Sequence, residues 1–431
     1  MSLSNSVKIH LLDPTVHNSQ RTEWRLEDAF WASSLKLVDL GVYSAQVDGD
    51  QTGLYYSSIN GVLNSIKGLT LYSGSTVLDQ VQELAAYGSI KNLMVSDQGS
   101  EDISRFQLLN GISLTQAPGG RGLTTQASDK DYDATYDLTL DPAISTLVRK
   151  ARHNNQIQMA SADDGGVSGM LLLSDYLEML KSVPVLAMLP ELRLVIEWNT
   201  SPLDYYNDAA APAAPASPVF TPIRPQLLAE ELLGQAAPKG MQKIPYVSTM
   251  VERFIVPAAA DGATVASSFR SGSVRQRYVK DLIFYNQTAT ADGWMLRSNR
   301  SVAQKGEKLQ LVMNGKKYLP DQGIDHEAMK MQFFNQTIGA LNVPLVAAMS
   351  SAADVVAGRD NILADATTRK LAHNMSVTAV SVNDVVDRLD IEYQRVGSTL
   401  AADQTASFNL LMFSHVQRLL EVQEGKIRLS Y

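Results

Sequence analysis

Histidines are the side chains best suited to bind a metal ion or move a proton near neutral pH, so their spacing is considered first. No two of them form a His-Glu-X-X-His pattern or another spacing that would place two ligands on one helix face. His326-Glu327 is most simply the start of a helix. We therefore predict no metal site among the six histidines, which are His10, His17, His153, His326, His373 and His415.

Two glycine-rich segments are the next candidates for ligand binding. Gly119-Gly-Arg-Gly122 lies in a polar stretch and lacks the Lys-Ser/Thr and the strand-loop-helix context of a phosphate-binding loop. It is interpreted as a surface turn. Asp163-Asp164, beside Gly165-Gly166, is interpreted as a solvated turn, with a calcium site as the alternative.

Nucleophiles and acid-base pairs are no better supported. The chain has no cysteine, which excludes disulfides, thiolate metal sites and cysteine nucleophiles. It has no Gly-X-Ser-X-Gly motif, and no pair of carboxylates is distinguished from the many others. We expect no catalytic residue, no cofactor and no metal ion, and hence a protein that is not an enzyme.

Composition narrows the remaining classes of function. The net charge is −8 and no run of Lys or Arg occurs, which argues against specific nucleic-acid binding. Charged residues make up only 19% of the chain, as suits a protein that buries surface against neighbours. No apolar run reaches the ~18 residues of a membrane span, and the first residues do not resemble a signal peptide. We expect a soluble chain made in a reducing compartment, with its five Asn-X-Ser/Thr sequons as chance matches.

The positioning elements are predicted to be mainly strands. From Leu192 to Trp198, apolar residues alternate with polar ones, as in a half-buried strand. The last residues, Gly425–Tyr431, repeat this alternation and again end on an aromatic. A second echo joins Ile66–Tyr72 to Val279–Tyr285. At 431 residues the chain exceeds what one core supports, so we expect two similar β domains of about 200 residues.

Further elements follow from local signals. Helices are expected from Thr76, as N-cap, through Ala85, at Ser174–Leu180 capped by Ser174-Asp175, and at His326–Ile338. Asn314-Gly315 predicts a hairpin after the strand Lys308–Met313. Between Thr22 and Tyr43 two strands are expected, with a helix over Leu26–Leu40 as the alternative. Other strands are expected at Tyr136–Leu140, Gln226–Leu233 and Tyr246–Val256, long loops at Gln116–Asp133 and Ala258–Ser273, and core positions at Trp24, Trp31, Trp198 and Trp294.

An Ala/Pro-rich tract divides the chain. Alternating Ala and Pro stiffen the tract towards an extended linker. The predicted organisation is an N-terminal arm at 1–20, a first domain at 21–206, the linker at 207–225 and a second domain at 226–431. Many short strands with few helices predict an all-β fold, with a sandwich or barrel in each half.

The pattern resembles a known family. The strand Leu189-Pro-Glu-Leu-Arg-Leu-Val-Ile-Glu-Trp198, preceded by Ser174-Asp-Tyr-Leu-Glu-Met-Leu180, is similar to the end of the first jelly roll in double jelly-roll major capsid proteins. These come from virophages, polinton-like viruses and large nucleocytoplasmic DNA viruses. Pro245–Phe254 and Arg275–Tyr285 resemble the first strands of the second roll. The Ala-rich segment 347–372 matches no motif of the family.

The resemblance implies two consecutive eight-stranded jelly-roll sandwiches in a structural virion protein. Three copies would form a pseudo-hexameric homotrimer that tiles an icosahedral shell, in contact with neighbouring capsomers and with penton and minor capsid proteins. The arm 1–20 would contact minor proteins or an internal membrane. The chain would be made in the host cytoplasm and reside in the virion. A minor capsid or vertex protein, and a carbohydrate-binding or glycan-hydrolysing β-sandwich protein, are the alternatives.

Overall fold

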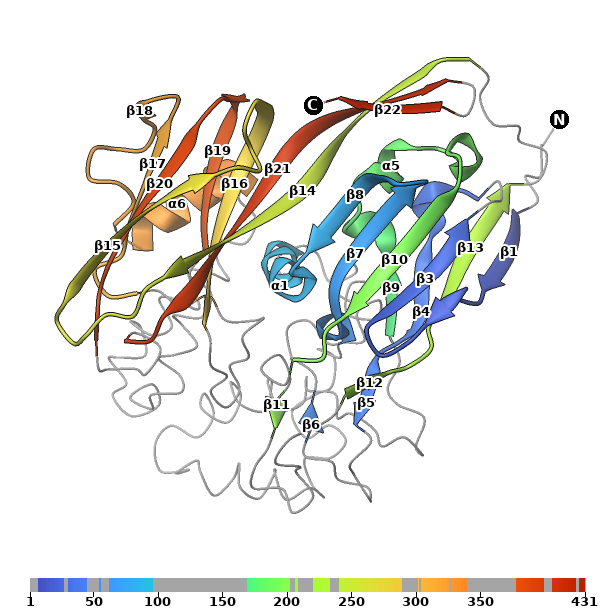
Figure 1. The fold of residues 1–431 in the computed structure, drawn as a ribbon, viewed down its shortest axis with the longest axis horizontal. Coiled ribbons are helices and arrows are strands. Elements are labelled where there is room, and N and C mark those ends of the chain that lie inside the picture. Colours follow the sequence, from blue (N-terminus) through green and yellow to red (C-terminus); the bar gives the residue numbers. More distant parts are fainter. Residues whose placement is uncertain are drawn as a thin grey trace.

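The fold is that of a computed structural model (Figure 1). It describes residues 7–26, 30–44, 54–55, 62–95, 169–201, 206–207, 220–232, 240–288, 301, 304–325, 327–338, 377–398, 405–423 and 426–430. The expected loop Gln116–Asp133, the expected strand Tyr136–Leu140 and the Ala-rich segment 347–372 lie outside these residues.

The first half forms a sandwich of two antiparallel sheets, here called roll 1. One sheet has the order β2-β3-β10-β7-β8 and the other the order β1-β13-β4-β9. The strands of roll 1 are β1 (Val7–Leu12), β2 (Val16–His17), β3 (Arg21–Leu26), β4 (Lys36–Leu40), β7 (Ile66–Ser73), β8 (Thr76–Gln82), β9 (Gly169–Leu172), β10 (Leu192–Trp198) and β13 (Gln226–Leu232).

Short helices and two small strand pairs complete this half. Strands β5 and β12 pair with each other, as do β6 and β11. These elements are η1 (Ala32–Ser34), β5 (Val42–Ser44), β6 (Leu54–Tyr55), η2 (Val62–Ser65), α1 (Leu84–Val95), η3 (Leu173–Asp175), α5 (Met179–Ser182), η4 (Leu186–Met188), β11 (Tyr206–Asn207) and β12 (Phe220–Pro222).

The second half forms roll 2, also from two antiparallel sheets. One has the order β14-β21-β16-β19, with β22 on β21, and the other the order β15-β20-β17-β18. Its elements are β14 (Gln242–Val256), β15 (Thr264–Ser271), β16 (Arg277–Thr288), β17 (Lys308–Met313), β18 (Lys316–Lys317), α6 (Glu327–Ile338), β19 (Val377–Val386), β20 (Leu389–Val396), β21 (Phe408–Gln423) and β22 (Lys426–Ser430). The predicted all-β, two-sandwich architecture is confirmed.

Two apolar cores hold the rolls together. The core of roll 2 packs its two sheets face to face around side chains such as Leu282, Leu311 and Met412. The other core fills roll 1 and continues across the boundary to Tyr285 and Phe413 on the opposite face of the large sheet of roll 2. Because successive strand residues point to opposite faces, β16 and β21 supply both cores. The two rolls therefore share buried apolar surface.

The internal repeat is real, but one of the two sequence echoes is misplaced. Strand β7 pairs with β10 as β16 pairs with β21, so Ile66–Tyr72 and Val279–Tyr285 occupy corresponding strands. The counterpart of β10 is β21, however, because β10 lies between β3 and β7 as β21 lies between β14 and β16. Among the described residues, the C-terminal strand β22 pairs with the far end of β21, and Ile427 and Leu429 pack against the core shared by the two rolls. It therefore does not take the central place in its sheet that β10 has.

Strand pairing also corrects the division of the chain. Gln226–Leu232, expected to open the second domain, pairs with β1 and β4 and so belongs to roll 1. Residues of the expected arm 1–20 form β1 and β2, which are strands of the same roll. The first roll takes both from outside the expected 21–206 because β13 has an apolar inner face, Leu227 and Ala229, that completes its core.

Other local predictions divide between right and wrong. The Asn314-Gly315 hairpin is confirmed, with φ of 51° and 80° at the two turn residues. The helix expected at Thr76–Ala85 is wrong, because this stretch pairs with β7 as strand β8 and the helix begins only at Leu84. The loop expected at Ala258–Ser273 contains strand β15, whose small polar residues alternate between exposed and half-buried.

Candidate functional site at the joint between the rolls

The described histidines, His10, His17 and His415, lie in three different strands, β1, β2 and β21. His10 lies 2.8 Å from Glu231, and His17 Nδ1 lies 2.8 Å from the Thr22 hydroxyl. Within the part of the chain that the structure describes, no group of three His, Asp or Glu side chains could hold a metal ion. Gly119–Gly122, Asp163–Gly166, His153, His326 and His373 lie outside that part.

The tryptophans divide as well. Trp24 and Trp198 are buried, as predicted, and the Trp198 indole N–H donates to the Thr22 hydroxyl at 2.9 Å. Trp31 is 42% exposed, so its predicted place in the core is wrong. Trp31 adjoins β13 through a backbone hydrogen bond to Glu230, and its side chain reaches solvent.

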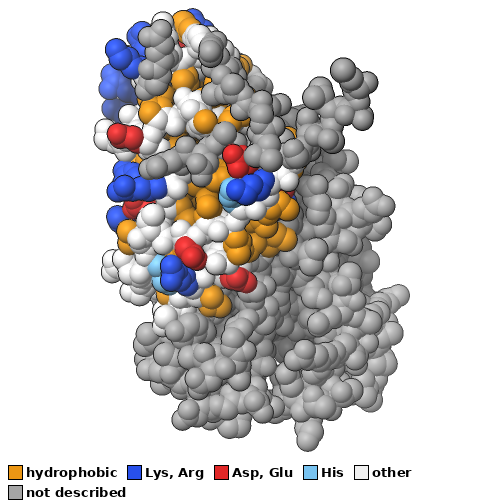
Figure 2. Space-filling model, turned by 90° about the vertical axis from the view of Figure 1, so that its right-hand side faces the viewer, with side chains coloured by type: hydrophobic (Ala, Val, Ile, Leu, Met, Phe, Trp, Pro, Cys, Tyr) orange, Lys and Arg blue, Asp and Glu red, His pale blue; other side chains and the backbone are white. Residues whose placement is uncertain are grey.

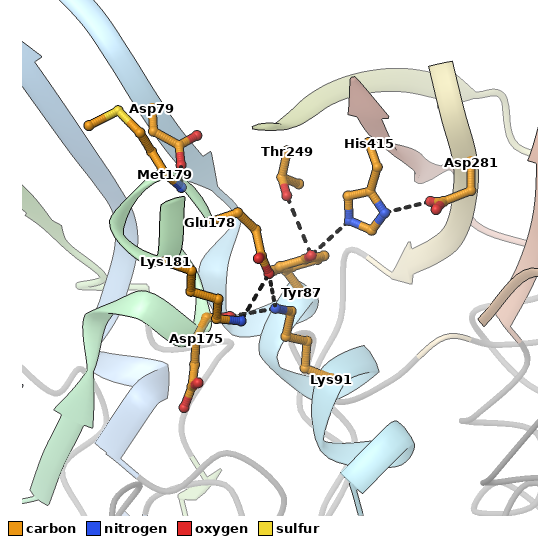
Figure 3. A network of polar contacts seen from close by, with 10 residues as sticks. All are labelled: Asp79, Tyr87, Lys91, Asp175, Glu178, Met179, Lys181, Thr249, Asp281 and His415. Atoms are coloured by element: carbon orange, nitrogen blue, oxygen red, sulfur yellow. Dashed lines mark hydrogen bonds and ion pairs between the residues drawn. The ribbon is translucent and has the colours of Figure 1, made fainter. Parts of the chain in front are cut away.

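The joint is the surface where β8, α1 and α5 of roll 1 meet β14, β16 and β21 of roll 2, and its buried polar groups form two clusters (Figure 3). The first surrounds Asp79 on β8. One carboxylate oxygen accepts from the Ser248 hydroxyl at 2.7 Å, and the other accepts from the Met179 backbone N–H at 3.1 Å. Asp79 thereby holds the start of α5 while it contacts β14. The cap expected from Ser174-Asp175 is wrong, because α5 begins later, at Met179. Its N-cap is Glu178, which makes no side-chain cap bond.

Burial has an electrostatic cost at this cluster. Asp79 is 1% exposed, and burial raises the pKa of its carboxyl to about 6, against the opposing effect of the hydrogen bonds from Ser248 and Met179 and of the nearby Arg418. Arg418 and Tyr246, both from roll 2, donate to the backbone carbonyl of Leu78. Roll 2 is therefore anchored to β8 by side chains and backbone together.

The second cluster joins α1 to the large sheet of roll 2. The Tyr87 hydroxyl lies 2.8 Å from His415 Nε2, and His415 Nδ1 lies 2.5 Å from a carboxylate oxygen of Asp281. Burial lowers the pKa of His415, but Tyr87 and the Asp281 carboxylate outweigh it and raise the pKa to about 9. At neutral pH His415 is therefore a cation held between two partners, with 16% of its side chain exposed. Thr249 also donates to the Tyr87 hydroxyl at 3.4 Å.

Helix α1 is fixed to α5 on its other side. Lys91 lies 3.4 Å from a Glu178 carboxylate oxygen and donates to the Asp175 carbonyl. Its ammonium also lies 5.3 Å from the centre of the Tyr87 ring, within range of a cation–π interaction. Helix α1 thus links the segment before β10, through Asp175 and Glu178, to both clusters. Asp79, Tyr87 and Asp281 of these clusters are buried, so the polar groups serve to bond one roll to the other.

A groove of about 580 Å³ runs along the joint. Its lining includes Arg21, Lys67, Glu83, Glu197 and Arg253, and Arg253 forms an ion pair with Glu83 across the two rolls. Trp198 is the aromatic residue among its lining residues, and it is only 4% exposed. The groove therefore provides mixed charges bridged by an ion pair, and its described lining residues include no exposed aromatic side chain of the kind expected in a sugar-binding cleft.

These residues left weak signals in the sequence. Asp79 and His415 each lie between apolar residues, in Leu78–Val81 and Phe413–Val416, and a charged or titratable group in such a setting indicates a buried partner. The partners could not be identified, because Tyr87 and His415 are 328 positions apart.

Comparisons with known proteins place the fold. The chain is similar to VP54 of PBCV-1, as fitted into a reconstruction of the virophage Sputnik, with TM-score 0.55, 9% identity and coverage of 100% of this chain and 98% of that one. It is also similar to the mavirus major capsid protein, with TM-score 0.53, 11% identity and coverage of 98% and 90%.

A chain of the Sputnik virophage structure gives TM-score 0.52, 11% identity and coverage of 99% and 88%. No family model and no curated protein matches the sequence. At such low identities the likeness establishes the double jelly-roll fold over the full length of the chain.

Proposed function

We propose that the protein is the major capsid protein of an icosahedral DNA virus. The observation that carries this is the full-length match of both rolls to VP54 of PBCV-1 and to the mavirus major capsid protein. A match to one roll would be compatible with many β-sandwich functions. Two rolls in one chain, matched end to end with those proteins, favour the same structural use.

The mechanism of such a protein is geometric. Three copies of two similar rolls give six similar lobes, so a homotrimer has a pseudo-hexameric outline that can tile the faces of a shell. The joint supports this role because its two clusters of polar contacts bond one lobe to the other. Neighbouring capsomers, penton proteins and minor capsid proteins are the partners, and the virion is the location. Synthesis in the host cytoplasm completes the proposal.

The N-terminal segment differs from the free arm that was expected. Contacts with minor proteins or an internal membrane were expected from a free arm at 1–20, but Val7–Leu12 and Val16–His17 are strands of roll 1. We therefore do not propose these inner-surface contacts for residues 7–17. No helix among the described residues is long and apolar enough to cross a membrane.

The alternatives have less support. A minor capsid or vertex protein usually has one roll, and two sandwiches count against it. A glycan-binding or glycan-hydrolysing protein needs exposed aromatics beside a carboxylate pair in a cleft. Among the described residues, the groove at the joint has Glu83 and Glu197, and its one aromatic residue is the buried Trp198.

Assembly state is the test. The purified chain is measured by light scattering after gel filtration and by negative-stain microscopy. We expect a particle of three times the 47.0 kDa chain mass with a six-lobed outline. A stable monomer, or a dimer, at micromolar concentration would contradict the proposed function.

A further inference from the structure

The four-stranded sheet of roll 1 has an apolar outer face. Residues paired directly across antiparallel strands lie on the same face, so the register defines its members. Leu11 pairs with Leu228, and Leu228 with Lys36 on β4. The apolar face, as we define it, consists of Val7, Ile9, Leu11, Trp31, Val38 and Leu228.

Four of these side chains, Val7, Ile9, Leu11 and Trp31, are exposed in the single chain, and Val38 and Leu228 are half-buried. Val7 is 45% exposed, Ile9 65% and Leu11 54%, although all three are large apolar residues on one strand. Trp31 adjoins them beside β13. The ion pair between Lys36 and Glu230, at 3.7 Å, is the charged pair set within this face. Figure 2 shows hydrophobic side chains gathered in the middle of the described surface on this side of the molecule.

Roll 2 provides an internal comparison. Its own four-stranded sheet has a polar outer face, in which Ala266 pairs with Gln394, Ser268 with Glu392 and Arg270 with Asp390. The two sheets have corresponding places in two similar sandwiches, so solvent exposure alone would favour the same kind of residue on both. The contrast indicates that the face on roll 1 is covered and the face on roll 2 is not.

Building on the proposed function, we propose that the apolar face is covered by a second copy of this chain within the capsomer. The four strands β1, β13, β4 and β9 have six, seven, five and four residues. At about 3.4 Å per residue and about 4.8 Å between strands, the sheet presents roughly 360 Å². That is about half of the ~800 Å² per partner that a stable interface buries, and more than one added strand would cover. A folded neighbour of the same size is therefore the fitting occupant.

The kind of surface also favours a permanent contact between copies. Obligate interfaces are more apolar than those that form between finished particles. The chain has further exposed apolar surface on roll 2, where Tyr278 pairs with Val385 at exposures of 37% and 48%. A threefold ring needs two different surfaces on each copy, so a neighbour can bring apolar residues of its own. Strand β1 is also the edge of its sheet among the described strands, which leaves its outer backbone groups available to that neighbour.

The test compares two pairs of charge substitutions. Ile9→Glu with Leu11→Glu places two charges on the apolar face, and Ala266→Glu with Ser268→Glu places them on the edge strand of the polar face of roll 2. All four positions are exposed, so both variants should keep the wild-type circular dichroism spectrum. We expect the first to weaken self-association by about 100-fold or more, because buried unpaired charges are costly, and the second to assemble as wild type.

A chemical probe covers the case of a variant that fails to fold. The chain has no cysteine, so Ile9→Cys and Ser268→Cys each supply one thiol for maleimide labelling. In the assembled protein we expect labelling at position 9 to be at least about tenfold slower than at position 268, since it requires dissociation. Equal labelling, or an intact trimer of the doubly charged variant, would overturn this inference and leave the trimer standing. A wild-type chain that does not self-associate would instead overturn the proposed function.

Discussion

The Asp79 carboxyl makes the joint sensitive to pH, and Asp79→Asn is the substitution that tests this. Asp79 is fully buried, and its pKa in the folded protein is about 6, against 3.8 for the free side chain. Because the folded-state pKa is the higher one, the stability linked to this group is fully present below pH 3.8 and is lost as pH rises through 6.

The magnitude follows from the shift. A difference of about two pKa units corresponds to roughly 3 kcal/mol over the full titration, of which about 2 kcal/mol falls between pH 4.5 and 7.5. An asparagine has no proton to lose. The free energy of unfolding of Asp79→Asn, minus that of the wild type, should therefore increase by about 2 kcal/mol between these two pH values.

The assay is equilibrium urea unfolding of both proteins at matched concentration, followed by tryptophan fluorescence, since Trp24 and Trp198 are buried in roll 1. Taking the difference at each pH removes the titration of all other groups. The same substitution at Asp321, which is exposed, is the control. A difference that stays flat across the range, or one that decreases with pH, would refute the assignment of Asp79 as a buried carboxylate at the joint.

Three further predictions concern buried contacts. His415→Phe removes a cation whose pKa is raised to about 9, so the stability deficit of the variant should be largest below pH 6.5 and shrink as pH rises through 9, as measured by thermal melting. Lys330→Met leaves Glu307, its buried partner at 2.8 Å, unpaired, and should cost about 3–5 kcal/mol in urea unfolding, with Glu307→Gln in the same chain restoring part of the loss. Gly397→Ala places a methyl group 2.0 Å from the Ala260 carbonyl oxygen and should lower the melting temperature, while Gly272→Ala, whose methyl group would lie at an ordinary 3.6 Å from Glu252, tests whether the cause is the clash.

Strands with a buried face were predictable because their pattern repeats every two residues. Leu192–Trp198 and Lys308–Met313 lie where their alternation indicated. The stretch after Thr76 misled because Leu78 and Val81 are three residues apart, as on a helix face. In the structure Leu78 and Val81 are both buried, although residues three apart on a regular strand point to opposite faces. A register shift at Leu71/Tyr72, where β7 pairs with β8, allows both side chains to be buried.

The joint could not be predicted, because its contacts depend on distance in space. Nothing near Asp79 in the sequence indicates that Ser248 lies 2.7 Å away, 169 positions later. The similarity of Gly425–Tyr431 to Leu192–Trp198 was equally local. Only pairing with the end of β21 decided that the last strand packs against the core shared by both rolls.

The sequence by itself determined that the chain is an all-β protein with a repeated strand pattern, because the alternation of apolar residues and the turn residues are local signals. The tertiary structure decided which strands pair and hence which faces are covered. Gln226–Leu232 joined roll 1, Asp79 and His415 became buried partners of the opposite roll, and Val7, Ile9 and Leu11 remained on an uncovered face. The physical reason is that each of these outcomes depends on contacts between residues far apart in the chain, and strand periodicity does not encode which distant surface a face will meet.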